Sequence, residues 1–180
     1  MSTSETRKLL YNEEQFKKEM HIFNLCYKYH KSAFEIINDK NNCTTEHNFY
    51  KYSMIKPLEI ANQIKNEEIK GEFLNHCSAI IFSVSKDFDR FGRVPYTEQE
   101  LKNNYQLISN GIVSCIRCKT SEELKECIKA MERLEKDGSL KGDTYCYYAI
   151  AMEIINKSIK YEKEIKKEAE IEATKEGWER

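Results

Sequence analysis

The sequence predicts an all-α protein, a single-domain bundle of about five or six mostly antiparallel helices. Tight turns and β-hairpins depend on glycine and proline, yet the 180 residues include only 6 Gly and 2 Pro. Apolar side chains instead recur at steps of three and four residues, which is the spacing of one helix face. With 40% hydrophobic residues, a chain of this length can bury one core. We therefore expect few turns and long helices.

The first predicted helix runs from about Glu13 to Asn38 and has a wide apolar face. One row of that face is Phe16, Met20, Phe23, Tyr27, His30, Phe34 and Ile37. A second row beside it is Ile22, Cys26, Tyr29, Ala33 and Ile36. Two adjacent rows are wider than the seam of a two-stranded coiled coil, so this helix should contact several neighbours.

Three shorter predictions cover the next part of the chain. A polar loop spans residues 39–48, and Thr44 or Thr45 can cap a helix that runs to about Ile55. Pro57 should break that helix, because proline has no amide hydrogen and disfavours a helical residue before it. Pro57 then fits the first turn of a new segment, 57–66.

A long core helix is predicted from Glu67 to Phe88, with apolar residues at helical spacing throughout. The clearest interruption of the chain follows at residues 91–96, which contain both Gly92 and Pro95. This loop splits the bundle roughly in half, and it marks the place where the domain of residues 1–161 would divide.

Two capping boxes predict where the next helices begin. Thr97 and Glu100 form the first, at the start of a helix that continues through Cys115, and Thr120 and Glu123 form the second. The short helix after the second box should end at Asp137-Gly138.

The last predicted helix is apolar on one face only as far as about Tyr161. Its seam is Tyr145, Tyr148, Met152, Ile155 and Ile159. The same seam continues through charged residues, so residues 162–180 should form a charged helical tail that projects partly into solvent.

Charge and cysteine content limit the classes of partner and compartment. The net charge is −1 and evenly spread, so no basic face is implied. The amino terminus lacks an apolar stretch like that of a signal peptide, and no segment is apolar enough to span a membrane. The chain has 7 Cys, an odd number, and free thiols in a reducing compartment are the simplest interpretation. We expect a cytoplasmic protein without a membrane partner.

Metal binding is a weak alternative that rests on four residues. Cys115 and Cys118 have the CxxC spacing, and Cys26 and His30 lie one helical turn apart, so a Cys3His zinc site would need all four to converge. Both pairs lie in predicted helices, and His30 is better interpreted as a hydrogen-bonded core histidine. As a redox pair, Cys115 and Cys118 fall at a helix carboxyl terminus, which disfavours the thiolate. We expect no cofactor.

Candidate binding residues lie on the central loop and in the last helix. Arg90, Phe91, Arg93 and Tyr96 combine arginine with aromatic rings, the composition of interface hot spots, on a loop. The alternative is that Phe91 and its neighbours anchor the loop to the core. Tyr147 belongs to an aromatic run that surrounds its helix, so it is a further candidate for contact with a partner. The favoured alternative is that the three tyrosines of this run face three different helices of the bundle.

The sequence therefore favours a protein-interaction module, an adaptor, inhibitor or regulatory factor without catalytic activity, of the kind that phages and pathogens also encode. Glycine-dependent nucleophile and phosphate-binding motifs are missing. A nucleic-acid-binding helical domain is the second hypothesis, but the short helix would present acids to phosphates. These acids are Glu122, Glu123, Glu126, Glu132 and Glu135. A helical metal-binding protein or enzyme is the third hypothesis.

Overall fold

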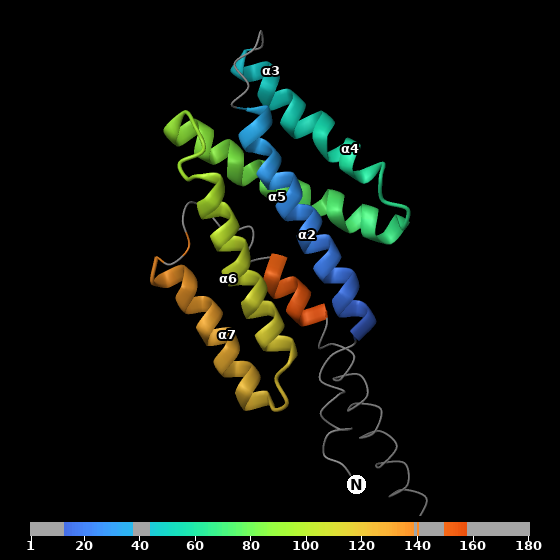
Figure 1. Cartoon of the computed structure of the whole chain (residues 1–180), viewed down its shortest axis with the longest axis vertical. Helices are drawn as coiled ribbons and strands as arrows, with labels where there is room; N and C mark the ends of the chain where they lie inside the picture. Colours follow the sequence, from blue (N-terminus) through green and yellow to red (C-terminus); the bar gives the residue numbers. More distant parts are fainter. Residues whose placement is uncertain (1–12, 38–43, 139, 141–149, 158–180) are drawn as a thin grey trace, which may run out of the picture.

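A computed structural model, shown in Figure 1, describes residues 13–37, 44–138, 140 and 150–157. These residues form helices and no strand, which confirms the all-α prediction. Among them, no helix is long and apolar enough to cross a bilayer. The predicted domain end at residue 161 and the charged tail lie outside the described residues. The elements are α2 (Glu13–Ile36), α3 (Thr45–Tyr50), η2 (Lys51–Ile55, a π-helix), α4 (Lys56–Ala61), α5 (Glu67–Phe91), α6 (Glu98–Ile116), α7 (Ser121–Lys136) and a helical stretch at 150–157.

Helix α2 is the centre of the bundle, as its wide face predicts. It packs against η2, α4, α5 and α6, and it crosses α5 in the middle of the molecule (Figure 1). Its fully buried apolar side chains come from both predicted rows. They are Ile22, Phe23, Cys26, Tyr29 and Ala33. Because each large apolar side chain contributes about 1.5–3 kcal/mol on burial, this face is the main source of stability, and it joins the helices on both sides of residues 91–96.

Three aromatic rings join α2 to η2 and α5. Tyr29 stacks on Tyr52 with ring centroids 4.6 Å apart, and it meets Phe73 edge-on at 6.4 Å. The Tyr29 hydroxyl also donates a hydrogen bond to the backbone carbonyl of Tyr52 over 2.7 Å. All three side chains are fully buried. This contact fixes both the position and the rotation of η2 on α2.

The predicted break at Pro57 takes a different form, because the helical path is continuous from Thr45 to Ala61. Pro57 does lie in the first turn of α4, as predicted, but a π-helix precedes it, with the Lys56 amide donating to the Lys51 carbonyl. A π-turn contains one residue more than an α-turn. It therefore turns both Tyr52 and Pro57, five positions apart, toward the core, where both are buried.

Thr44 caps α3 by accepting a hydrogen bond from the His47 amide, and the threonines of the two predicted capping boxes also cap their helices. Thr97 accepts a hydrogen bond from the Glu100 amide and Glu100 accepts one from the Thr97 amide, so the first capping box is complete. Thr120 accepts from the Glu123 amide over 3.1 Å. The Glu123 carboxylate, however, accepts from the amide of Lys119 rather than from that of Thr120. In the second capping box, the carboxylate therefore bonds the amide one residue before the one that a standard box predicts.

Helix α7 packs beside α6 through a narrow apolar face (Figure 1). Met131 is its most deeply buried residue, at 2% exposure. A Cβ atom on Gly111 of α6 would lie only 2.9 Å from the Met131 Cγ, so the missing side chain lets the two helices approach closely. Gly138 has a φ of 70°, the left-handed conformation expected of a residue that ends a helix, which confirms the predicted end of α7.

The described part of the last helix, 150–157, packs on the core through four buried side chains. They are Ile150, Ala151, Ile154 and Ile155. Of the predicted seam, Ile155 is buried and Met152 is half-buried. Tyr145, Tyr148 and Ile159 lie outside the described residues.

The contact between Tyr29 and Tyr52 gives a first prediction. Tyr29→Phe keeps the stacked ring but removes the hydroxyl that bonds the Tyr52 carbonyl, so the free energy of unfolding should fall by about 1 kcal/mol. Tyr50→Phe is the matched control, because Tyr50 is 54% exposed on the same helical segment. Urea denaturation followed by circular dichroism measures both. Equal stabilities of the two variants would contradict the role given to this hydrogen bond.

Candidate functional site

The predicted binding loop has an exposed side and a buried side. Arg90, Phe91 and Arg93 are exposed, and the Arg90 guanidinium carbon lies 5.3 Å from the centre of the Phe91 ring. Phe91 is 49% exposed, so it does not anchor the loop in the core. The anchor is Phe88, one turn earlier, whose half-buried ring meets that of Phe49 at 6.1 Å.

Tyr96 was expected on this exposed surface, and that expectation is wrong. Its side chain is 5% exposed, and its hydroxyl is hydrogen bonded to His30 Nε2 at 2.7 Å. Complete burial lowers the pKa of His30 to about 3, so the imidazole is uncharged at neutral pH. His30 is thus a hydrogen-bonded core histidine, and Tyr96 holds the end of the loop against α2.

The four residues of the metal alternative do not form one site. Cys26 is buried in the core and His30 bonds Tyr96. Cys115 lies against the Met131 sulfur at 3.8 Å, whereas Cys118 lies against Cys127. Across the residues that the structure describes, no group of three or more histidines, cysteines or acids is placed to hold a metal ion. Cys115 and Cys118 both lie near Cys127, whereas Cys26 and His30 have other neighbours, so the four side chains do not converge as a Cys3His site requires.

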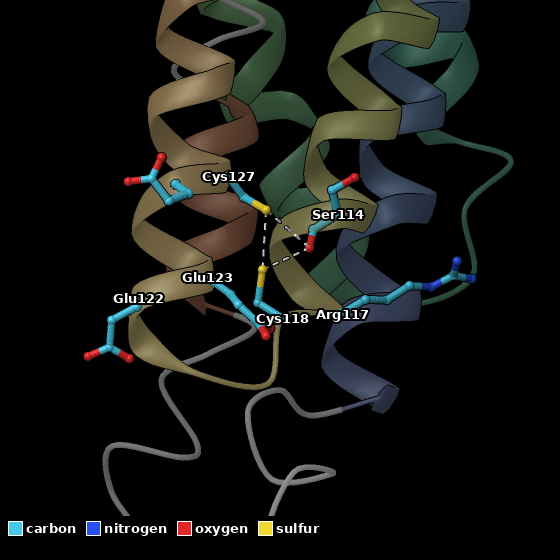
Figure 2. Close-up of a pocket in the computed structure, with 7 residues that line it drawn as sticks. Ser114, Arg117, Cys118, Glu122, Glu123 and Cys127 are labelled. Carbon is cyan, nitrogen blue, oxygen red and sulfur yellow. Dashed lines mark hydrogen bonds between the residues drawn. The ribbon is translucent and has the colours of Figure 1, made fainter.

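An open groove lies where α6 ends and α7 begins, as Figure 2 shows. Its volume is about 690 Å³. Cys118 and Cys127 meet there with their sulfur atoms 3.3 Å apart, and both thiols donate to the Ser114 carbonyl. The other residues along the groove are mostly charged: Arg117, Glu122, Glu123 and Glu126. The acidic lining disfavours an anionic ligand and a phosphate backbone.

An apolar surface that the sequence did not predict lies on the outer side of α3, η2 and α4. We call it the apolar ridge and define it as Tyr50, Met54, Ile55 and Leu58, which are 54%, 58%, 39% and 54% exposed. The residues follow one another on successive turns of one helical segment. The side of this helical segment that carries Tyr52 faces α2. The ridge lies on another side of the segment, which no other helix covers within the described part of the chain.

A cluster of charged side chains lies between the last helix, α2 and α5. Lys157 reaches carboxylates on three helices: Glu153 at 3.1 Å, Glu72 of α5 at 3.3 Å and Glu19 of α2 at 3.7 Å. Glu19 is fully buried and also accepts a hydrogen bond from Gln15 over 2.8 Å. This cluster ties 150–157 to α2 and α5.

The pKa values of Glu19, which is buried, and Glu72, which is half-buried, shift in opposite directions. Burial first, and the adjacent Glu72 carboxylate second, raise the pKa of Glu19 from 4.5 to about 7. Burial also acts to raise the pKa of Glu72, but the interactions with Glu19, Lys157 and Lys18 outweigh it and lower that pKa overall. One oxygen of each carboxylate is buried without a hydrogen-bond partner among the described residues. A proton on Glu19 removes the charge from the more buried of the two.

Sequence reasoning missed both the ridge and this cluster. A signal for Glu19 was available, because the row Ile22, Cys26, Tyr29 extends back by one step of three residues to Glu19. The ridge had no such signal, since its apolar residues have the spacing of a core face. Tyr147, the remaining candidate, lies outside the described residues and stays a prediction.

The two sides of the loop should respond differently to mutation. Tyr96→Phe removes the hydroxyl that bonds His30 inside the core, so it should lower the free energy of unfolding by about 1 kcal/mol. Arg93→Ala changes an exposed side chain and should stay within about 0.5 kcal/mol of wild type. Thermal and urea unfolding of the two variants test this. A larger loss of unfolding free energy for Arg93→Ala than for Tyr96→Phe would contradict the assignment of Arg93 to the exposed side of the loop and Tyr96 to the buried side.

The Glu19 pKa predicts a pH dependence of stability. Because its pKa is higher in the folded chain than in the unfolded chain, protonated Glu19 stabilises the fold below about pH 4.5, and this contribution is lost as pH rises to about 7. Glu19→Gln is neutral at every pH. The stability of wild type relative to Glu19→Gln should therefore fall by up to about 3 kcal/mol between pH 4.5 and 8. A difference that stays constant with pH would show that Glu19 is ionised throughout.

Comparison with protein-family models, curated proteins and solved structures finds no match for this chain. The function proposed below therefore rests on the arrangement of its own residues, above all on the apolar ridge and on the exposed side of residues 90–93.

Proposed function

We propose that this chain is a protein-interaction module, an adaptor, inhibitor or regulatory factor without catalytic activity of its own, that inserts the apolar ridge into a groove of a partner protein. One observation carries the proposal. Seven large apolar side chains are exposed in the described residues, and the four of the ridge lie within nine positions of one helical segment. Single exposed apolar residues are ordinary, whereas a contiguous exposed patch marks an interaction site.

The shape of the ridge favours a protein groove as its complement. Tyr50, Met54 and Leu58 project from successive turns of a helix, which is the anchor pattern of helices that bind in apolar grooves. Methionine adapts to an irregular apolar surface, and tyrosine combines apolar area with a polar tip. The cavity beside the ridge, which Ile55 lines together with Ile36 of α2, is small, at about 180 Å³.

Charged residues of both signs border the ridge. The contact between Phe49 and Phe88 places α3 against the last turns of α5, at the same end of the bundle (Figure 1). The exposed charged residues around the ridge include Lys51, Arg90 and Arg93 as cations and Glu46, Glu59 and Asp89 as acids. The exposed Phe91 ring, with its charged neighbours, extends the apolar contact by a polar border that a partner's groove can pair with.

A cytoplasmic location is part of the proposal. The five described cysteines are reduced thiols rather than disulfides, which fits a reducing compartment.

A double substitution on the ridge tests the proposal. Met54→Glu with Leu58→Glu places two charges at the centre of the ridge, and Phe82→Glu is the matched control, because Phe82 is 63% exposed on α5. Proteins captured from extracts of the source cells by wild type are identified by mass spectrometry, and each is purified and titrated with the three proteins. We expect one partner whose affinity falls at least tenfold with the ridge variant and not with Phe82→Glu.

Two results would overturn the proposal. One is equal binding of every captured protein by wild type and the ridge variant. The other is a wild-type dimer, detected by sedimentation, that dissociates when the ridge is substituted. The ridge would then be covered by a second copy of the chain. The ridge variant should unfold within about 1 kcal/mol of wild type, because both side chains are exposed, so lost binding would not reflect a lost fold.

A further inference from the structure

The pair of thiols in the groove of Figure 2 has no role in the proposed protein contact. Cys118 follows the end of α6 and Cys127 lies in the second turn of α7, and their sulfur atoms are 3.3 Å apart. The two sulfur atoms are therefore already in van der Waals contact in the reduced chain. The pairing crosses from one helix to the next and is independent of the CxxC spacing between Cys115 and Cys118.

The pair has a structural role in the reduced chain. The Cys118 amide bonds the Cys115 carbonyl at 3.4 Å, so it does not reach the Ser114 carbonyl as it would in a continuing α-helix. The two thiols donate to the Ser114 carbonyl instead, with Cys118 Sγ at 3.1 Å and Cys127 Sγ at 3.8 Å from its oxygen. Both side chains are therefore held toward the same point.

We propose that Cys118 and Cys127 are an oxidation site, at which a hydroperoxide converts the two thiols into a disulfide that joins α6 to α7. The oxidant reaches the pair through the open groove. Cys127 is the sulfur it meets first, since Cys127 is half-buried at the groove and Cys118 is 7% exposed.

The reaction balances in two steps. The Cys127 sulfur attacks the peroxide ROOH, so that an S–O bond forms, the O–O bond breaks and ROH leaves with the thiol proton. The Cys118 sulfur then attacks the resulting sulfenic acid, so that the S–S bond forms, the S–O bond breaks and water leaves with the second thiol proton. Two electrons pass from the sulfurs to the peroxide. A dithiol reductant reverses the change by thiol–disulfide exchange.

The surroundings assign different roles to the two thiols. Burial, with further contributions from Cys127, Cys115 and Glu123, raises the pKa of Cys118 to about 12. A thiol that is rarely ionised at neutral pH is a poor first attacker of peroxide. Cys118 is instead placed to resolve the sulfenic acid on its neighbour. Cys115 is the third thiol nearby and also interacts with Cys127, but it is 1% exposed and its Sγ also lies against the Met131 sulfur, so peroxide reaches it less easily than Cys127.

The disulfide would restrain a helix that packs mainly on one neighbour. Within the described residues, α7 packs mainly on α6, and its first two turns carry the three acids of the groove. A covalent bond at Cys127 holds those turns to the end of α6. Amide exchange in α7 should therefore slow on oxidation, while exchange in α4, on the far side of α2, stays unchanged.

Peptide mapping tests the proposal directly. The full-length reduced protein is treated with a small molar excess of hydrogen peroxide, its remaining thiols are blocked, and it is digested with trypsin without reduction. Cleavage after Arg117, Lys119, Lys125 and Lys129 places Cys118 and Cys127 on separate short peptides, and Cys115 on a third. We expect the 118–119 and 126–129 peptides linked, with a mass lower by two hydrogen atoms than their sum, and separated again by dithiothreitol.

Variants distinguish this reaction from nonspecific oxidation. In Cys118→Ser the sulfenic acid on Cys127 should persist and be captured by dimedone, whereas Cys77→Ser, which changes a buried thiol elsewhere, should form the disulfide as wild type does. Linkage of Cys115 to either partner, oxidation of Cys127 to a sulfinic acid without a disulfide, or no reaction of Cys127 would each overturn the proposal.

Discussion

Burial of the wide apolar face of α2 is the constraint on which the rest of this structure depends. Its two apolar rows are too wide for one neighbour, so η2, α4, α5 and α6 are arranged around it. The Tyr29 and Tyr52 contact shows how closely the neighbours are fixed, because it combines a stacked ring with a hydrogen bond. With α2 covered, the outer face of α3, η2 and α4 has no described helix to pack on. The apolar ridge follows from that geometry.

The same helix holds the one buried carboxylate of the core that Lys157 contacts. Burying a charge is unfavourable unless it is paired or neutralised. Glu19 has both remedies, since Lys157 lies 3.7 Å away and its raised pKa allows it to be protonated near neutral pH. An apolar residue at this position would fill the space, but it would not specify where 150–157 docks. The charge cluster therefore sets the position of the last helix at some cost in stability.

Much of the fold was predictable from the sequence, because helix formation and capping are local. The spacing of Phe73, Cys77, Ile80 and Val84 identified α5, and Thr97 identified the start of α6. Local patterns fail where long-range packing decides the outcome. Pro57 predicted a break, but the π-turn that keeps it in the helix depends on α2 requiring Tyr52 and Pro57 on the same side.

The candidate site was less predictable for the same reason. Periodicity shows which residues share a face, and it does not show whether another helix covers that face. The spacing of Met54 and Leu58 therefore does not distinguish an exposed face from a core face, and Tyr96 was expected on the surface although it bonds His30 inside the core. Cys118 and Cys127 are nine positions apart and become neighbours only because α6 and α7 pack together.

The central claim is that the ridge is uncovered in the isolated chain and available to a partner. Carbene footprinting of the full-length protein, at several concentrations and without other proteins, measures this for individual side chains. The account predicts strong labelling of Met54 and Leu58 and weak labelling of Tyr52, the buried residue between them, at every concentration. Labelling of Met54 and Leu58 as weak as that of Tyr52 would show that the chain or a second copy of it already covers the ridge, and would contradict the account.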